Sequence, residues 1–99
     1  VEALLASAYR PQSDGEVFNL GGERPYSLRE FVEILLTVVG GGSYALVPFP
    51  EDRRRIDIGS YYGDYSKIKS ALDWQPAVPL AEGLQRTVEY YRRHRKHYC

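Results

Sequence analysis

Residues 27–42 read SLREFVEILLTVVGGG, and this stretch predicts the clearest helix in the chain. Ser27 and Glu30 have the spacing of a capping box, in which the serine hydroxyl accepts a hydrogen bond from the backbone N–H of Glu30 and the glutamate side chain reaches back. Apolar residues at helical spacing form one stripe along the predicted helix: Leu28, Phe31, Val32, Leu35, Leu36 and Val39. The three glycines that follow predict the end of the helix.

On either side of this helix, predicted helices alternate with short extended runs. Helices are predicted for residues 1–9, 64–72 and 80–93, with Asp64 as the N-cap of the middle one. Strands are predicted for residues 16–20 and 44–47, and a short extended piece for 58–63. This order predicts an α/β fold, with a few short strands and three to four helices in a single unit, residues 1–99.

The composition is that of an ordinary globular chain. Thirteen basic residues balance thirteen acidic ones, and 43% of the 99 residues are hydrophobic, which excludes a disordered polyelectrolyte and a histone-like DNA binder. No apolar run reaches the length of about 20 residues that spans a bilayer, so we expect a cytoplasmic protein without a membrane partner. The chain begins at Val1 and contains no methionine, and we therefore expect a processed chain or a fragment.

The residue types that usually carry chemistry are poorly placed in this sequence. His94 and His97 lie in a basic run without neighbouring carboxylates, so no metal site is expected. Cys99, the one cysteine, stands at the end of the sequence and is expected to be a free thiol. No catalytic residue is predicted from these groups.

The basic run itself has two interpretations. Residues 92–97 contain four of the thirteen basic residues, so residues 1–91 carry nine basic and thirteen acidic residues, a net charge of −4. Such a run can bind an anionic partner such as RNA. A solvated helix end, where cations favour the helix dipole, is the interpretation that we prefer.

Arg53, Arg54 and Arg55 form a second basic cluster, with Asp57 shortly after it. Arginine guanidiniums bind phosphate through paired hydrogen bonds, and a carboxylate can accept hydrogen bonds from sugar hydroxyls. With Tyr61 and Tyr62 beside them, these residues suit a phosphorylated sugar. The alternative is a solvated loop with local ion pairs.

Several motifs together resemble the extended short-chain dehydrogenases/reductases, the NAD-dependent epimerases and dehydratases of nucleotide sugars. The resemblance covers about residues 15–93: VFNLGG at 17–22, SLREF at 27–31, DYSK at 64–67, ALDWQP at 71–76, LAEGL at 80–84 and a tyrosine pair at 90–91. Asp73 stands where that family often has glycine. The resemblance implies a C-terminal, substrate-binding fragment of a Rossmann-type enzyme, in which strand 16–20 joins the sheet and helix 27–39 covers it.

The resemblance implies that the full-length enzyme binds NAD, whereas this fragment binds no cofactor and is inactive alone. The family's phosphate-binding sequence G-x-x-G-x-x-G is absent from the 99 residues. Tyr65 and Lys69 have the spacing of the family's Tyr-x-x-x-Lys catalytic pair, but they lie in a segment where the family has none. We therefore expect no catalytic residue in this chain.

The site residues follow from the resemblance. It implies that Arg54 binds the diphosphate, Asp57 the nucleotide ribose, and Tyr61 the wall beside the transferred sugar. Arg53 or Arg55 replaces Arg54 if the register of the loop differs. The expected substrate is a UDP- or dTDP-hexose, and the expected full-length enzyme is a homodimer that does not bind nucleic acid.

The expected activity is that of a UDP-glucose 4-epimerase, which oxidises the sugar at C4 and reduces it again. The alternatives within the family are a dTDP-glucose 4,6-dehydratase and a UDP-glucuronate decarboxylase. An alternative of another class is a noncatalytic module that binds anions or RNA through the basic run.

Overall fold

A computed structural model describes residues 1–98 of the chain. Cys99, and with it the expectation of a free thiol, lies outside the described residues. The described part contains these helices in order: α1 (Glu2–Tyr9), the 3₁₀ helix η1 (Pro11–Ser13), α2 (Leu28–Val39), α3 (Glu51–Arg54), α4 (Ser66–Leu72), α5 (Leu80–Arg93) and the 3₁₀ helix η2 (Arg95–His97). They belong to two units, one of Val1–Pro25 with Tyr62–Ala77 and one of Tyr26–Tyr61 with residues 78–98.

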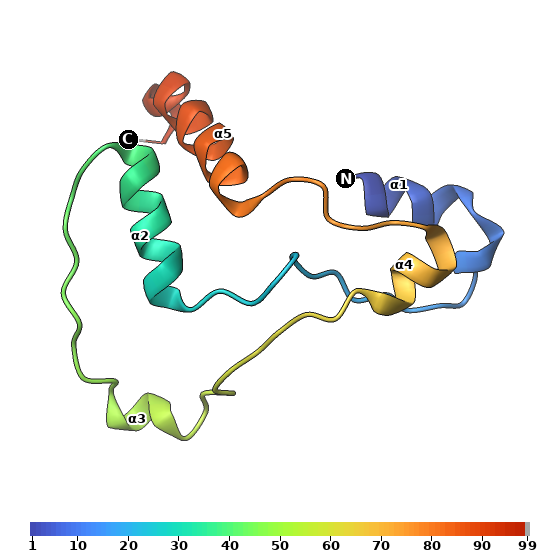
Figure 1. Cartoon of the computed structure of the whole chain (residues 1–99), viewed down its shortest axis with the longest axis horizontal. Coiled ribbons are helices and arrows are strands. Elements are labelled where there is room, and N and C mark those ends of the chain that lie inside the picture. The colour runs from blue at the N-terminus through green and yellow to red at the C-terminus, as the bar shows by residue number, and fades with distance from the viewer. Residues whose placement is uncertain (99) are drawn as a thin grey trace. The chain divides into compact units, whose positions relative to one another are not determined.

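The first unit is built around α1 and α4, with η1 between them in the sequence (Figure 1). Its core is small and consists of Ala3 from α1 with Ile68 and Leu72 from α4. Ile68 and Leu72 are 1% and 2% exposed, so the i, i+4 pair predicted from the sequence is confirmed. Partly buried side chains surround the core: Ala6, Phe18, Tyr65, Ala71 and Trp74.

The second unit contains α2 and α5, which pack against each other (Figure 1). The predicted capping box is present: the backbone N–H of Glu30 donates to Ser27 Oγ at 3.1 Å, and that of Ser27 donates to Glu30 Oε2 at 2.8 Å. Gly40 ends α2 with φ 87°, a conformation that favours glycine because a side chain would be strained. No side chain in the described residues of this unit is buried.

The prediction of an α/β fold with short strands is wrong for this chain, because the described residues contain no β-strand. No backbone hydrogen bond joins residues 17–20 or 44–47 to another segment in the described part. A strand needs a partner strand to satisfy its N–H and C=O groups, and neither run has one here. The expected packing of helix 27–39 on strand 16–20 fails for the same reason, and α2 contacts α5 instead.

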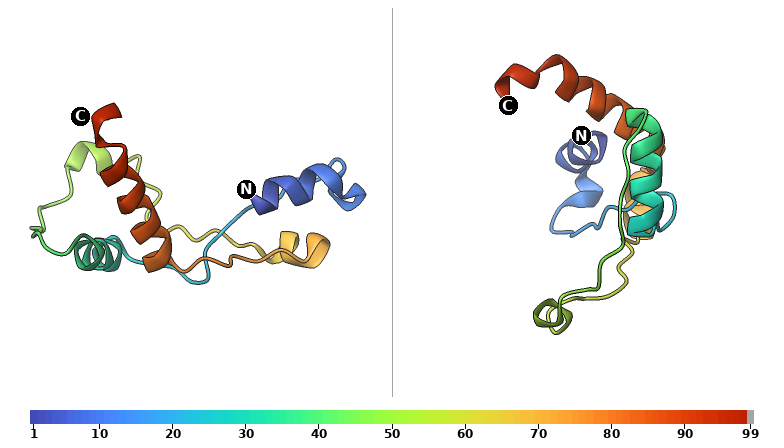
Figure 2. Two further views of the ribbon diagram at one scale, coloured as in Figure 1. Left: turned by 90° about the horizontal axis from the view of Figure 1, so that it is seen from above. Right: turned by 90° about the vertical axis from the view of Figure 1, so that its left-hand side faces the viewer.

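The helix α3 also departs from the predictions (Figure 2). It is a single helical turn, where the sequence predicted a loop. Pro50 precedes it with φ −59°, a value that the proline ring imposes. Glu51 and Asp52 lie in its first turn and Arg53 and Arg54 in its last, the order that the helix dipole favours. This proline and charge pattern is the sequence signal for α3.

None of the helices in residues 1–98 is both long enough and apolar enough to cross a membrane.

The one visible departure from the family motif, Asp73, lies at the end of α4. Asp73 follows the helix with φ 53°, the only positive φ of a non-glycine residue among residues 1–98. Left-handed backbone is strained for side chains, although Asp and Asn tolerate it better than most other residues. Asp73 therefore replaces glycine at a position where the backbone itself favours glycine.

We predict that Asp73→Gly leaves the free energy of unfolding unchanged or raises it by up to about 1 kcal/mol, because it relieves left-handed strain. Asp73→Val should lower it by about 1–2 kcal/mol. The matched control is Asp14→Gly, where φ is an ordinary −62°. There glycine only adds freedom to the unfolded chain, so the free energy of unfolding should fall. Urea unfolding measures the free energy of unfolding of all three variants. If Asp73→Gly lowers it as much as Asp14→Gly does, left-handed strain at Asp73 is contradicted.

Candidate functional site

The turn of α3 positions the arginine cluster. The carbonyl oxygen of Pro50 accepts hydrogen bonds from the backbone N–H groups of Arg53 at 3.1 Å and Arg54 at 3.2 Å. These bonds fold the arginine run into a helical turn, so its side chains leave the backbone in different directions. The turn thus decides which guanidinium lies beside which carboxylate.

Arg54 lies beside an acidic residue of its own helix. Its guanidinium is 3.3 Å from Glu51 Oε1, an i, i+3 pair, and its side chain is 67% exposed. An open hollow of about 530 Å³ is lined by Glu51, Asp52, Arg54 and Arg55. Arg54 is therefore accessible to an anion from solvent, and its present partner is an exposed carboxylate.

Asp57 belongs to the same turned segment as Arg54. The backbone N–H of Asp57 donates to the carbonyl oxygen of Arg53 at 3.1 Å, which continues the turn beyond α3. Tyr61 lies further on, after Gly59 with φ 70°, and its side chain is 72% exposed. In the described residues no hydrogen bond or ion pair joins the side chains of Arg54, Asp57 and Tyr61. The structure thus brings Arg54 and Asp57 into one turn and leaves Tyr61 apart from them.

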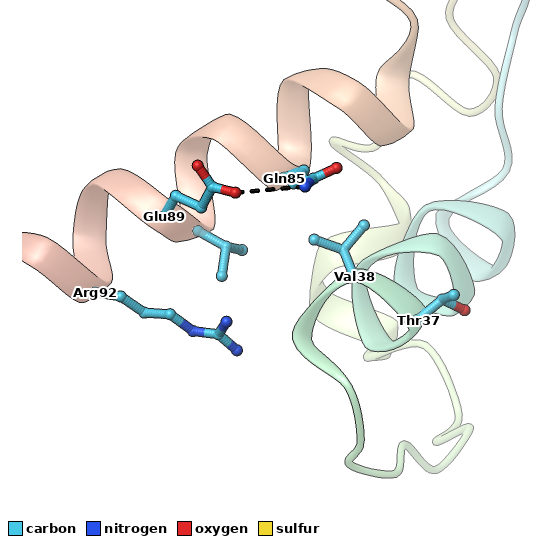
Figure 3. Close-up of a pocket in the computed structure, with 6 residues that line it drawn as sticks. Thr37, Val38, Gln85, Glu89 and Arg92 are labelled. Carbon is cyan, nitrogen blue, oxygen red and sulfur yellow. Dashed lines mark hydrogen bonds between the residues drawn. The ribbon is translucent and has the colours of Figure 1, made fainter.

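The start of the basic run takes part in the second unit's own packing. Arg92 donates to the carbonyl oxygen of Val39 at 2.9 Å, so a cation of α5 satisfies an acceptor at the end of α2. The residues around this contact line a hollow between the two helices (Figure 3). Further along, the ring of His94 stacks on Tyr90 with centroids 4.3 Å apart. Residues 92–94 therefore make structural contacts at the helix ends.

Sequence reasoning missed Lys67, whose side chain makes contacts with residues 16–18. Its ammonium lies 2.6 Å from Glu16 Oε2, donates to the carbonyl oxygen of Val17 at 2.9 Å, and lies 5.3 Å from the centroid of the Phe18 ring. We call these contacts the Lys67 latch. It joins residues about fifty positions apart, which no local pattern could reveal.

Glu16, which belongs to the latch, and Asp64 have lowered pKa values. The hydrogen bond and positive charge of Lys67 lower the pKa of Glu16 below its ordinary value of 4.5. Hydrogen bonds from the hydroxyl and backbone N–H of Ser66 lower the pKa of Asp64. Asp64 was predicted as the N-cap of this helix, whereas the helix begins at Ser66 and Tyr65 takes the N-cap position. The Asp64 carboxylate still accepts from the first helical residue.

Among residues 1–98 no three His, Asp or Glu side chains lie close enough together to hold a metal ion. The arginine turn offers guanidiniums and carboxylates. It can bind an anion through Arg54 and accept hydrogen bonds from hydroxyl groups through Asp57.

Comparison with known proteins relates this chain to enzymes of sugar nucleotides. The chain is 40% identical to a dTDP-glucose 4,6-dehydratase of Streptomyces griseus over 81 residues, which are 82% of this chain and 24% of that protein. It is 35% identical to UDP-glucuronic acid decarboxylase 1 of Xenopus tropicalis over 80% of this chain and 18% of that protein. It is 34% identical to a UDP-glucuronate 4-epimerase of Thermodesulfobacterium geofontis over 76% of this chain and 23% of that protein.

This chain is homologous to the C-terminal part of sugar-nucleotide dehydratases and epimerases. This chain spans about a quarter or less of the length of these three relatives. No protein-family model matches it, and no solved structure matches it significantly. The resemblance inferred from its motifs is thus confirmed at the level of the enzyme class, and the particular member is not determined.

We predict that the Lys67 latch makes the free energy of unfolding of this chain depend on pH. Because Lys67 lowers the pKa of Glu16, the pair stabilises the fold fully above the ordinary pKa of 4.5. That stabilisation is lost as the pH falls through the lower, folded-state pKa of Glu16. In Lys67→Met this part of the decline should disappear.

Urea unfolding between about pH 3 and pH 7 measures the effect. Lys69→Met is the matched control, because Lys69 is an exposed lysine of the same helix, and its side chain forms no hydrogen bond or ion pair in the described part. It should keep the pH dependence of the unaltered chain. The same pH dependence in Lys67→Met would show that Glu16 and Lys67 are not coupled.

Proposed function

We propose that this chain is the nucleotide-sugar-binding part of an NAD-dependent sugar-nucleotide dehydratase, decarboxylase or epimerase. The observation that carries the proposal is the turn that holds Arg54 and Asp57 together in a homologue of the C-terminal part of such enzymes. In this proposal Arg54 binds the diphosphate and Asp57 the ribose, while Tyr61 lies beside the hexose. Arg53 and Arg55 flank Arg54 and add positive charge.

The energetics of Arg54 permit this role. Its ion pair with Glu51 is exposed on both sides, with side chains 67% and 83% accessible. Exposed pairs of this kind contribute about 0–1 kcal/mol, whereas hydrogen bonds to charged groups contribute about 1.5–3 kcal/mol. A diphosphate offers several charged oxygens to the guanidinium, so it can displace the Glu51 carboxylate. Glu51 then acts as a weak competitor that holds Arg54 before the substrate binds.

Asp57 bears on the choice of nucleotide. An ionised carboxylate is an acceptor with two oxygens, and the 2′- and 3′-hydroxyls of a ribose can donate to both. The deoxyribose of dTDP lacks one of these hydroxyls. The residue type therefore supports a ribonucleotide sugar such as a UDP-hexose, and replacing Asp57 with alanine should reduce any preference for UDP-hexose over dTDP-hexose.

The oxidation step lies outside the residues of this chain. NAD supplies hydride transfer at C4 of the hexose in the activity that we propose, and a protein contributes orientation and binding to such a reaction. The 99 residues contain no G-x-x-G-x-x-G sequence, and the glycines at 40–42 follow a helix, so they do not fit this cofactor. We therefore assign the chain to substrate binding and place no catalytic group in it.

Within this class we rank a dehydratase or decarboxylase above a UDP-glucose 4-epimerase. The ranking rests on the relatives, since two of the three named above carry those activities in their names. The UDP-glucose 4-epimerase expected from the motifs remains the alternative. A homodimer of the full-length enzyme also remains part of the proposal.

We predict that Arg54→Ala in the full-length enzyme weakens binding of the nucleotide sugar by about 1.5–3 kcal/mol, the range for a hydrogen bond to a charged group. Glu51→Gln should tighten binding by up to about fivefold, because it removes the competing carboxylate. Arg86→Ala is the control, since Arg86 is an exposed arginine paired with Glu82 on α5. Calorimetric titration measures all three, and an unchanged dissociation constant for Arg54→Ala overturns the role of Arg54.

We predict that the full-length enzyme converts a UDP- or dTDP-hexose to a product formed after oxidation at C4. A 4-keto-6-deoxy sugar identifies the dehydratase, loss of CO₂ from UDP-glucuronate the decarboxylase, and UDP-galactose from UDP-glucose the epimerase. Mass spectrometry and NMR of the products distinguish these outcomes. Conversion of none of these substrates in the presence of NAD would contradict the enzyme class.

A further inference from the structure

The second unit contains a third hollow, which the proposed function does not use. Its volume is about 500 Å³, and its lining comes from α2, α5 and the turn η2 that follows α5. Apolar side chains form most of its wall: Leu35, Val88, Tyr91 and Tyr98. Thr87, Arg92 and Arg95 complete the lining. A mainly apolar and aromatic wall with a few polar groups, at this volume, is typical of a site for a small molecule.

The turn η2 provides one wall of this hollow. The backbone N–H of Tyr98 donates to the carbonyl oxygen of Arg95 at 3.0 Å, which closes a 3₁₀ turn after α5. Tyr98 thereby packs edge-on against Tyr91, with the two ring centroids 4.9 Å apart. Edge-to-face contacts of this kind are favourable between aromatic rings. Local contacts therefore hold the aromatic wall in place.

The charges at the hollow are those of its two arginines. None of the described residues that line it carries a carboxylate, and Glu89 of α5 is paired with Arg93 at 3.8 Å. Arg95 is exposed, and its side chain forms no hydrogen bond or ion pair within residues 1–98. Arg92 donates one hydrogen bond to the carbonyl oxygen of Val39 and retains other N–H groups. The lining thus offers guanidinium donors beside an apolar wall.

The hollow shown in Figure 3 lacks this combination. It shares Val88 and Arg92 with the larger hollow, but its lining includes the Glu89 carboxylate and the Gln85 amide. Its volume is about 290 Å³. A carboxylate in the lining repels an anion, so only the larger of these two hollows complements a negative charge.

We propose that the hollow between Leu35, Tyr91 and Tyr98 binds a small carboxylate with an apolar body. The body lies against the tyrosine rings and Leu35, where burial of apolar surface favours binding. The carboxylate accepts hydrogen bonds from the guanidinium of Arg95. This site shares no residue with the arginine turn of α3, and it does not depend on the proposed function.

The test titrates the full-length enzyme with two probes that differ in charge. One is 1-naphthylacetate, and the other is 2-(1-naphthyl)ethanol, which has the same ring system and no charge. We expect the carboxylate to bind about tenfold more tightly than the alcohol, which is the size of one hydrogen bond to a charged group. Calorimetric titration measures both dissociation constants. Arg54→Ala should bind the carboxylate like the unaltered enzyme, because Arg54 belongs to the other site.

A first pair of variants tests the charge. Arg95→Gln should weaken binding of the carboxylate by about tenfold and leave binding of the alcohol unchanged. Lys96→Gln is the matched control, because it removes a neighbouring exposed cation that does not line the hollow. It should bind both probes like the unaltered enzyme.

A second pair of variants tests the place. Thr87→Trp fills the hollow and should abolish binding of both probes. Thr37→Trp is the matched control: Thr37 is an exposed threonine of α2 outside this hollow, and both hydroxyls donate to the carbonyl oxygen four residues earlier, at 3.0 Å for Thr37 and 2.8 Å for Thr87. Thr37→Trp should keep the binding of both probes. Where Thr87→Trp fails to fold, Arg95→Gln decides, because it changes an exposed side chain.

Four results would overturn the proposal. If the unaltered enzyme binds neither probe at about 1 mM, the rest of the enzyme covers the hollow. If both probes bind with equal affinity, the arginines do not select an anion. If Arg95→Gln weakens neither probe, or both alike, Arg95 does not bind the carboxylate. If light scattering shows that Thr87→Trp separates an oligomer that Thr37→Trp leaves intact, a second copy of the chain occupies the hollow.

Discussion

A β-strand persists only where a second strand supplies the other half of its hydrogen bonds, and this constraint shapes the whole chain. Helices satisfy their backbone groups internally, so they form wherever the local sequence allows. Apolar residues of the two unpaired runs are largely exposed, with Val17 at 78% and Val47 at 80%, whereas Phe18 is partly buried against the core. The result is a set of well-formed helices joined by extended chain, with one small core in the first unit.

Where strand pairing is missing, side chains and short turns hold the extended chain. Lys67 holds residues 16–18 against α4, and backbone hydrogen bonds join Arg54 to Pro50 and Asp57 to Arg53 at the turn of α3. The Lys67 latch and the turn of α3 each depend on a few exposed polar contacts, which are individually weak in water. Function assigned to such contacts should therefore respond to pH and to single substitutions more than function built on a packed core would.

Local patterns predicted the parts of the fold that depend on neighbouring residues. The capping box at Ser27, the pair Ile68 and Leu72, and the bounds of α5 were all readable from spacing alone. The strands could not be predicted correctly, because their existence depends on partners and not on their own residues. Of the site, Arg54 and Asp57 were recognisable by residue type and spacing, whereas the Lys67 latch joins residues too far apart in the sequence to leave a pattern.

The central claim is that this chain carries the nucleotide-sugar contacts of a larger enzyme. The most direct measurement is a structure of the full-length enzyme with UDP-glucose or dTDP-glucose bound. The account predicts the guanidinium of Arg54 within hydrogen-bond distance of the diphosphate, and the carboxylate of Asp57 on the nucleotide's pentose. A bound nucleotide sugar whose diphosphate lies away from residues 53–57 would contradict it.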